Sequence, residues 1–132
     1  MAQERREAIE TREAPKAIGP YTQALAFGEW LFLSGQIGLE PTSGELVAGG
    51  IAAETRQALA NLGAVLRAAG ADFSDVVRTT LYLVDLADFA VVNEIYGSVF
   101  APPYPARVTV GVSSLPRGAR IEIDAIARRR SS

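Results

Sequence analysis

The sequence predicts an α+β domain of two layers, in which one sheet carries two helices on one face. Two segments have apolar residues at helical spacing, and the segments before, between and after them have the composition of strands. A strand followed by a helix and a second strand favours right-handed parallel pairing, which places both helices on the same face of the sheet. With 132 residues, of which 48% are hydrophobic, the chain is expected to form a single domain over residues 1–132.

The first part of the chain is expected to form short strands joined by specific turns. A short strand is expected near residues 7–11. Residues 23–27 and 30–34 flank Gly28 and Glu29, which are typical of a two-residue hairpin turn. Because WLFLS at 30–34 is nearly all apolar, this strand is expected to be buried on both faces.

Two stretches of this region are candidates for one side of a site. Residues 14–24, APKAIGPYTQA, contain two prolines and a glycine, which fix a non-helical path and hold Tyr21 and Gln23 in place. Such a segment is either a packed strap or one wall of a site. At Ser34 and Gly35 an apolar strand ends on a hydroxyl and a residue without a Cβ, where a ligand can approach the backbone closely. A plain strand-ending turn fits these two residues equally well.

Two amphipathic helices are expected in the middle of the chain. The first spans residues 51–69 and ends at Gly70, and its core-facing residues are Ala58, Leu59, Leu62, Val65, Leu66 and Ala69. Residues 75–84 are rich in Val, Thr, Leu and Tyr, which is typical of a central strand. Asp88 is expected to cap the second helix, whose apolar stripe consists of Phe89, Val92, Tyr96, Val99 and Phe100. Asn93 lies beside this stripe, where a lone Asn is most often solvated.

The last part of the chain is expected to be extended. Residues 101–106 contain three prolines, so they cannot continue the helix and lead into a strand that begins near Arg107. On that strand one face carries Arg107, Thr109, Gly111 and Ser113, and the other carries Val108, Val110 and Val112. The final strand is expected from about residue 120 to 128. Since the helices cover one face of the sheet, the other face is expected to be buried in a symmetric oligomer.

The composition excludes several kinds of chemistry. A chain with no Cys and no His has no thiol nucleophile, no disulfide, no structural zinc site of the usual kind and no His-based acid-base catalysis. A net charge of -2 gives no reason to expect nucleic-acid binding, and the three arginines at 128–130 are expected to form a solvated tail. The first residues fit no targeting signal, and no run reaches the roughly 18 apolar residues that span a membrane, so a cytoplasmic protein is expected.

The residues that remain for chemistry include a cation and a carboxylate on the last two strands, Arg107 and Glu122. A structural ion pair is the simplest interpretation of such residues. If the two strands formed a plain hairpin, however, residue 113 would face residue 122, and Arg107 would lie about 20 Å away along the strand. The two residues then either do not cooperate or meet in another way, for instance across a subunit boundary.

The same segments resemble the reactive intermediate deaminase A (YjgF) family over nearly the whole chain. The resemblance is carried by APKAIGPYTQA, by LFLSGQIGLEPTSGEL, by the stretch from residue 55 to 100, and by PARVTVGVSSLPRGARIEI. In the last segment, Pro-Ala-Arg is followed at fixed spacing by an apolar-Glu-Ile triplet, which is specific to the family. The resemblance implies a chorismate-mutase-like fold, assembled as a homotrimer with ligand clefts between subunits, in which the last two strands are not neighbours.

The resemblance also implies hydrolysis of reactive enamines and imines, such as 2-iminobutanoate and 2-iminopropanoate, to 2-oxo acids and ammonia, with no cofactor and no metal. An imine carbon is already electrophilic, so water can add once it is positioned and a proton is managed. By resemblance, Arg107 binds the substrate carboxylate and Glu122 orients or activates the water. The remaining pocket positions are Tyr21, Ser34, Gly35, Asn93 and Thr109. Thr109 stands where some members have a cysteine, and hydrolysis survives this change if the position contributes its backbone carbonyl.

Two other functions are compatible with such a resemblance. One is a non-catalytic trimer whose clefts bind a small carboxylate or whose surface binds a partner protein. The other is ribonuclease activity or inhibition of translation, against which the acidic composition and the absence of His both argue.

Overall fold

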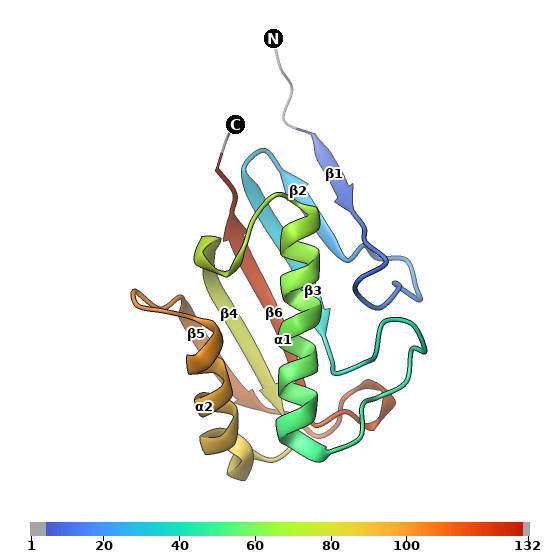
Figure 1. Ribbon diagram of the computed structural model, residues 1–132, viewed down its shortest axis with the longest axis vertical. Coiled ribbons are helices and arrows are strands. Elements are labelled where there is room, and N and C mark those ends of the chain that lie inside the picture. Colours follow the sequence, from blue (N-terminus) through green and yellow to red (C-terminus); the bar gives the residue numbers. More distant parts are fainter. Residues whose placement is uncertain (1–4, 131–132) are drawn as a thin grey trace.

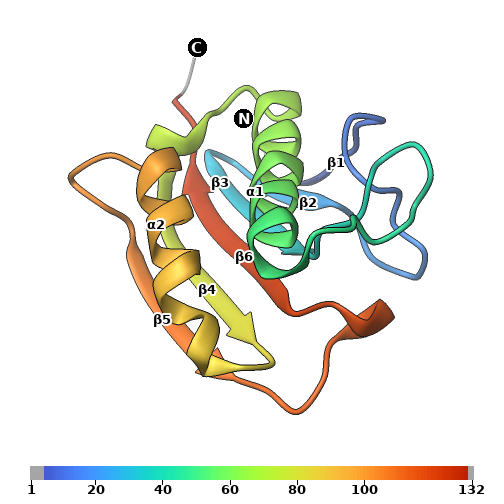
Figure 2. The same ribbon diagram turned by 60° about the horizontal axis from the view of Figure 1, so that its bottom comes forward.

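The computed structural model describes residues 5–130, which form a six-stranded sheet with two α-helices on one face (Figure 1). The strands are β1 (Arg6–Ile9), β2 (Ala24–Phe27), β3 (Trp30–Gln36), β4 (Val76–Leu83), β5 (Ala106–Gly111) and β6 (Ile121–Arg128), and the helices are α1 (Gly50–Ala68) and α2 (Phe89–Val99). Figure 2 shows both helices above the same side of the sheet, so the predicted α+β class is confirmed. Within residues 5–130, no helix is long and apolar enough to cross a membrane.

Strand β6 lies in the middle of the sheet, whose order is β1-β2-β3-β6-β4-β5. It pairs antiparallel with β3 on one side and with β4 on the other. Strands β4 and β5 are parallel, and α2 connects them. The last two strands are therefore not neighbours, because β4 lies between them. The expectation drawn from the family resemblance is confirmed, and a hairpin of β5 with β6 does not form.

The core lies between the sheet and the helices. Every second residue of β6 is buried beneath the helices, namely Ile121, Ile123, Ala125 and Ala127. Helix α1 presents the predicted stripe to this layer, and its buried residues include Ala58, Leu59, Leu62, Val65 and Leu66. Gly70 follows the helix with φ 80, a left-handed conformation that glycine adopts without strain. The predicted first helix and its end are confirmed.

The opposite face of the sheet, here called the uncovered face, carries large apolar side chains that no part of the described chain covers. Its exposed members include Phe27, Trp30, Phe32, Val108 and Val110. The prediction that residues 30–34 are buried on both faces is wrong for the single chain, because Leu31 is buried whereas Phe32 is 46% exposed. Both helices cover the same face, so alternate residues of β3 have no second layer above them.

The start of α2 differs from the prediction. Asp88 directly precedes the helix but its side chain makes no capping hydrogen bond. Its backbone is already helical (φ -77, ψ -3), whereas a capping residue usually has an extended backbone. The preceding turn is capped instead by Asp85, whose Oδ1 accepts a hydrogen bond from Ala87 N at 2.9 Å. Phe89 is exposed, although it was expected in the apolar stripe with Val92, Tyr96, Val99 and Phe100.

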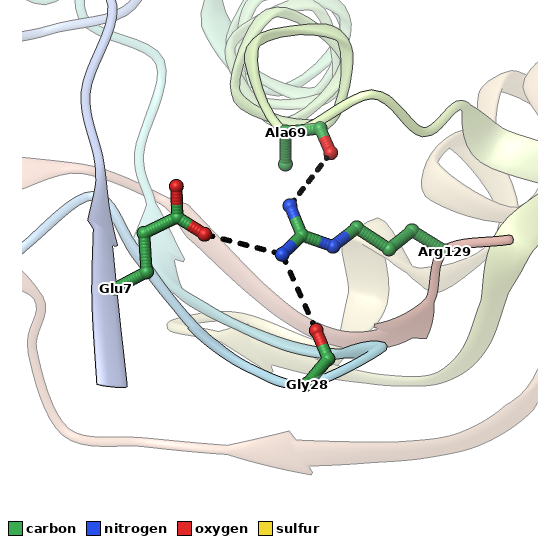
Figure 3. Close-up of polar contacts among 4 residues, drawn as sticks. All are labelled: Glu7, Gly28, Ala69 and Arg129. Atoms are coloured by element: carbon green, nitrogen blue, oxygen red, sulfur yellow. Dashed lines mark hydrogen bonds and ion pairs between the residues drawn. The ribbon is translucent and has the colours of Figure 1, made fainter. Parts of the chain in front are cut away.

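Two of the three arginines at 128–130 contact other parts of the protein. Arg129 donates hydrogen bonds to Ala69 O at 3.1 Å and Gly28 O at 3.2 Å, and it pairs with Glu7 at 3.2 Å (Figure 3). Arg128 pairs with Glu29 at 2.9 Å. The prediction of a solvated tail is wrong for Arg129, whose side chain is only 25% exposed and joins β1, the β2–β3 turn and the end of α1 to the end of β6. The Arg128 side chain pairs with the turn but stays 60% exposed.

Candidate functional site

The two charged residues singled out in the sequence lie on opposite faces of the sheet. Arg107 on β5 is opposite Thr79 on β4, and Thr79 is fully buried beneath the helices. Glu122 on β6 is opposite Tyr82, on the uncovered side of β4. Because β4 and the thickness of the sheet separate them, Arg107 and Glu122 do not meet within one chain. The site residues therefore form two groups.

The first group is built around Arg107, between β5 and α2. The guanidinium carbon of Arg107 lies 4.9 Å from the ring centre of Tyr96 and 5.4 Å from that of Phe89. The Tyr96 hydroxyl is itself fixed by a buried hydrogen bond of 2.7 Å with Thr79 Oγ1. Such stacking attracts the cation to the ring faces and leaves the N–H groups at its edge free to donate. Within residues 5–130, Arg107 forms no ion pair with a carboxylate.

Two buried polar atoms without hydrogen-bond partners lie on β5 and α2, the elements that flank Arg107. They are Asn93 Oδ1 on α2 and Thr109 Oγ1 on β5, and neither has a hydrogen-bond partner among residues 5–130. Thr109 is opposite the buried Leu81, so it points to the same side of the sheet as Arg107. Buried polar atoms usually find partners, so each of these can pair with a water, a ligand or a neighbouring molecule. The sequence-predicted residues Arg107, Asn93 and Thr109 are thus brought to one region.

The second group lines a cleft of about 640 Å3 beside the start of β6. Tyr21, Ser34, Gly35 and Glu122 all line it. The Ser34 hydroxyl donates a hydrogen bond of 2.6 Å to Thr22 O, so in the single chain it fixes the neighbouring loop. Tyr21 is 52% exposed at the edge of the cleft. The structure therefore brings four of the sequence-predicted residues to one cleft.

Gly35 is the residue over which the Glu122 carboxylate packs. A Cβ built on Gly35 would lie 2.8 Å from Glu122 Cδ, closer than any ordinary contact. In the structure the group that approaches Gly35 closely is the Glu122 side chain of the same protein, and the approach of a ligand at this position stays a prediction. Burial raises the pKa of Glu122 above its ordinary value, and the charge of Asp124 raises it further. Asp124 is held in turn by the Tyr82 hydroxyl at 2.8 Å.

No group of three or more carboxylates, His or Cys within residues 5–130 is arranged to hold a metal ion. The chemistry that the two groups can perform is the recognition of an anion by Arg107 and the transfer of a proton by Glu122.

The sequence model of one family, described as endoribonuclease L-PSP, matches residues 11–129. The chain belongs to this family. The chain is similar to a mouse member named 2-iminobutanoate/2-iminopropanoate deaminase, which is 53% identical over 122 residues, 92% of this chain and 90% of the mouse protein. The recognition of the reactive intermediate deaminase A family from sequence motifs is confirmed.

Solved structures of L-PSP family proteins share the fold. The YjgF gene product from E. coli has a TM-score of 0.89 and 45% identity, covering 94% of this chain and 99% of that chain. E. coli TdcF with bound serine has a TM-score of 0.89 and 41% identity, over 94% of this chain and 99% of that chain.

Sequence reasoning missed several residues of this L-PSP family chain that support the site. Tyr96 and Phe89 were assigned only to an apolar stripe, although both hold Arg107. Asp124 could have been found, because it follows Glu122 by two residues on the same strand and so shares its face. The role of Tyr82 depends on strand pairing over a long sequence separation, which no local pattern reveals.

Proposed function

We propose that this protein hydrolyses small 2-imino acids, with 2-iminobutanoate and 2-iminopropanoate as its substrates, to 2-oxo acids and ammonia. The observation that carries this proposal is that the Arg107 guanidinium stacks on two aromatic rings and has no carboxylate partner in residues 5–130. The name of the mouse relative, at 53% identity, supports the same reaction. The serine bound to TdcF supports a ligand that is small and carries a carboxylate.

The two groups of residues divide the reaction between them. Arg107 binds the substrate carboxylate through two parallel hydrogen bonds, which its planar fork allows. Glu122 accepts a proton from the water that adds to the C=N carbon and passes it to the nitrogen, which gives a carbinolamine. Glu122 then moves the proton of the carbinolamine hydroxyl to the nitrogen as the C–N bond breaks and the C=O bond forms. One water is consumed and one ammonia leaves, so the products are a 2-oxo acid and ammonia. The raised pKa of Glu122 suits this role, because an acid-base group works best when its pKa lies close to the working pH.

The complete site lies between subunits of a trimer in this proposal. Arg107 and Glu122 face opposite sides of one sheet, so a cleft that contains both needs two chains. The apolar uncovered face, with Phe32 46% exposed, provides a surface that a second copy would bury. The proposed setting is the cytoplasm, where pyridoxal-phosphate-dependent dehydratases release such imines.

The reaction is tested by generating 2-iminobutanoate with a threonine dehydratase and measuring how fast the imine disappears. The wild-type protein is expected to accelerate the loss of the imine over buffer. Arg107→Ala and Glu122→Gln are each expected to reduce kcat/KM by at least about a hundredfold. If the wild type gives no acceleration, or if Arg107→Ala retains full activity, the proposed function is wrong.

The shared site is tested by mixing the two inactive variants under conditions that allow subunits to exchange. If each site takes Arg107 from one chain and Glu122 from its neighbour, about a quarter of the sites in a random trimer have both residues, so about a quarter of the wild-type activity should return. The matched control mixes Arg107→Ala with the double variant, which can rebuild no site. A mixture of exchanged trimers that stays inactive would show that the site does not lie between chains.

The uncovered face is tested by Phe32→Glu, which places a charge in the proposed interface. Analytical ultracentrifugation is expected to show dissociation to monomers, and activity is expected to be lost with it. Ala60→Glu is the control, because Ala60 is exposed on α1, on the other side of the molecule. A fully active monomer would contradict the assembly.

A further inference from the structure

One wall of the cleft is a short segment with little structure of its own. Residues 16–21, KAIGPY, here called the outer wall, contain Lys16, Ile18 and Tyr21, which line the cleft. All three are exposed, and Ile18 is 76% exposed. Within the described chain, one hydrogen bond is internal to the outer wall, from Tyr21 N to Gly19 O at 2.8 Å, and none joins it to the rest of the protein. The position of the outer wall must therefore be set at its two ends.

The end that follows the outer wall is fixed to the sheet by Ser34. Its hydroxyl donates to Thr22 O at 2.6 Å, and its backbone N–H donates to Gln23 O at 3.0 Å. Ser34 directly precedes Gly35, over which the Glu122 carboxylate packs. The residue after Tyr21 is thus tied to the strand that supports Glu122.

The end that precedes the outer wall is fixed by the side chain of Gln23. Its Oε1 accepts a hydrogen bond from Thr11 N at 2.7 Å, and its Nε2 donates to Thr11 O at 3.0 Å, Ala14 O at 3.3 Å and Pro15 O at 2.8 Å. The Gln23 residue is only 4% exposed. One buried amide therefore joins the segment before the outer wall to the strand after it.

We propose that Gln23 is a positioning residue of the site, which holds the outer wall, and with it Tyr21, at a fixed distance from Glu122. Gln23 touches no substrate; it acts through the backbone at Pro15 and Thr22, between which the outer wall is suspended. The inference rests on the proposed function in one respect, namely that Tyr21 contacts the substrate.

Only an amide can make this set of hydrogen bonds. The backbone around Gln23 presents one N–H, from Thr11, and three carbonyl oxygens, so the side chain must accept at one atom and donate at the other. Gln23→Met keeps the length of the side chain but removes both functions. Gln23→Glu keeps the acceptor but turns the donor into an oxygen that faces three carbonyls.

The first test is steady-state kinetics of Gln23→Met in the coupled imine assay. Because Arg107 and Glu122 are unchanged, kcat is expected to stay within about twofold of wild type, while KM rises at least about tenfold as the outer wall loses its fixed position. Thr55→Ala is the matched control, since Thr55 is fully buried in α1, its hydroxyl donates to Ile51 O, and it does not line the cleft. It should lower stability and leave KM unchanged.

The second test uses pH to restore the missing donor. In Gln23→Glu the introduced carboxyl is buried against carbonyl oxygens, which raises its pKa. Below that pKa its hydroxyl can donate to a carbonyl, so the KM defect relative to wild type should shrink as pH falls. The titratable groups that line the cavities on either side are Glu10, Arg12, Lys16, Tyr21, Arg117 and Glu122. The effect of their own titration on KM is removed by dividing the KM of Gln23→Glu by the KM of the wild type at each pH.

The third test needs no catalysis, so it separates this inference from the proposed function. Hydrogen exchange in the oligomeric wild type and in Gln23→Met should differ in residues 11–22, with faster exchange in the variant, and should agree in α1 and β4. Titration with 2-oxobutanoate should show at least about tenfold weaker binding to the variant. If the imine assay fails for the wild type but the exchange result holds, the proposed function falls and the positioning role stands.

The inference is overturned if Gln23→Met behaves like Thr55→Ala, with lower stability but with KM and the exchange of residues 11–22 unchanged. A double-mutant cycle tests whether Gln23 acts through Tyr21. If Gln23 acts through Tyr21, the double variant should lose less transition-state stabilisation, measured from kcat/KM, than the sum of the losses in Gln23→Met and Tyr21→Ala. Full additivity would show that the two residues act separately.

Discussion

Replacing Gly35 by alanine should displace the Glu122 carboxylate while leaving the fold intact. The φ angle of Gly35 is outside the left-handed region, so the backbone accepts an alanine without strain. The added Cβ would lie 2.8 Å from Glu122 Cδ and 2.9 Å from Cγ, and an ordinary contact begins at 3.4 Å. Glu122 Oε2 would lie closer to the Cβ than Cδ does, so the carboxyl group must retreat by more than about 0.6 Å; because it ends a flexible side chain, it can do so without moving the strands.

The expected loss of activity follows from that displacement. A misplacement of about 1 Å can reduce a rate about a hundredfold, so we expect kcat of Gly35→Ala to fall by roughly tenfold to a hundredfold. The free energy of unfolding should change by less than about 1 kcal/mol, since the lower entropy of the unfolded alanine chain offsets part of the crowding.

The measurement is the coupled imine assay together with chemical denaturation at one protein concentration. Gly97→Ala is the matched control, because a Cβ on this α2 glycine meets no atom within 4 Å. The control should keep full activity and gain about 0.5–1 kcal/mol of stability, as expected for Gly to Ala within a helix. If Gly35→Ala retains wild-type kcat, the contact between Gly35 and Glu122 does not position the catalytic carboxylate.

Three further predictions concern stability and pH. Arg129→Ala should lower the free energy of unfolding by about 1.5–3 kcal/mol, because it removes charge-assisted hydrogen bonds to two backbone carbonyls and a contact with Glu7; Arg130→Ala should have no measurable effect in the same denaturation experiment. Glu122→Gln should stabilise the protein at pH 7 but not at pH 4. A carboxyl whose pKa is raised in the folded state favours folding below its unfolded pKa and loses this contribution as pH rises through its folded pKa. Equal effects of the substitution on the free energy of unfolding at the two pH values would contradict the raised pKa. Thr79→Val should cost about 1–3 kcal/mol by leaving the buried Tyr96 hydroxyl unpaired, and adding Tyr96→Phe should recover most of that loss.

Elements whose residues interact locally were predictable from the sequence. Helix α1 has an uninterrupted apolar stripe and a glycine at its end, and both features act within a few residues of each other. The β2–β3 turn was found for the same reason, since Gly28 adopts φ 63 at the position where the hairpin reverses. The alternation of Arg107 and Thr109 against Val108 and Val110 follows from the geometry of a single strand.

Features that depend on distant segments were not predictable. The apolar run at 30–34 gives no sign of which face a helix will cover, so burial on both faces was the natural expectation. The supposed solvated tail is bound because Arg129 reaches Ala69 and Glu7, which are far away in the sequence. That β5 and β6 are not neighbours was predicted from the family resemblance. The residues alone indicated only that a plain hairpin would keep Arg107 and Glu122 apart.

The central position of β6 has a consequence for synthesis of the protein. During translation, β3 and β4 emerge from the ribosome well before residues 121–128, which are the strand that joins them. Until then each has an unpaired edge, and the nascent chain exposes backbone groups that other chains could pair with. The sheet can therefore close only after nearly all of the described chain has been made. A translational pause before Ile121 would prolong this exposure, and a premature stop there would release a chain prone to aggregation.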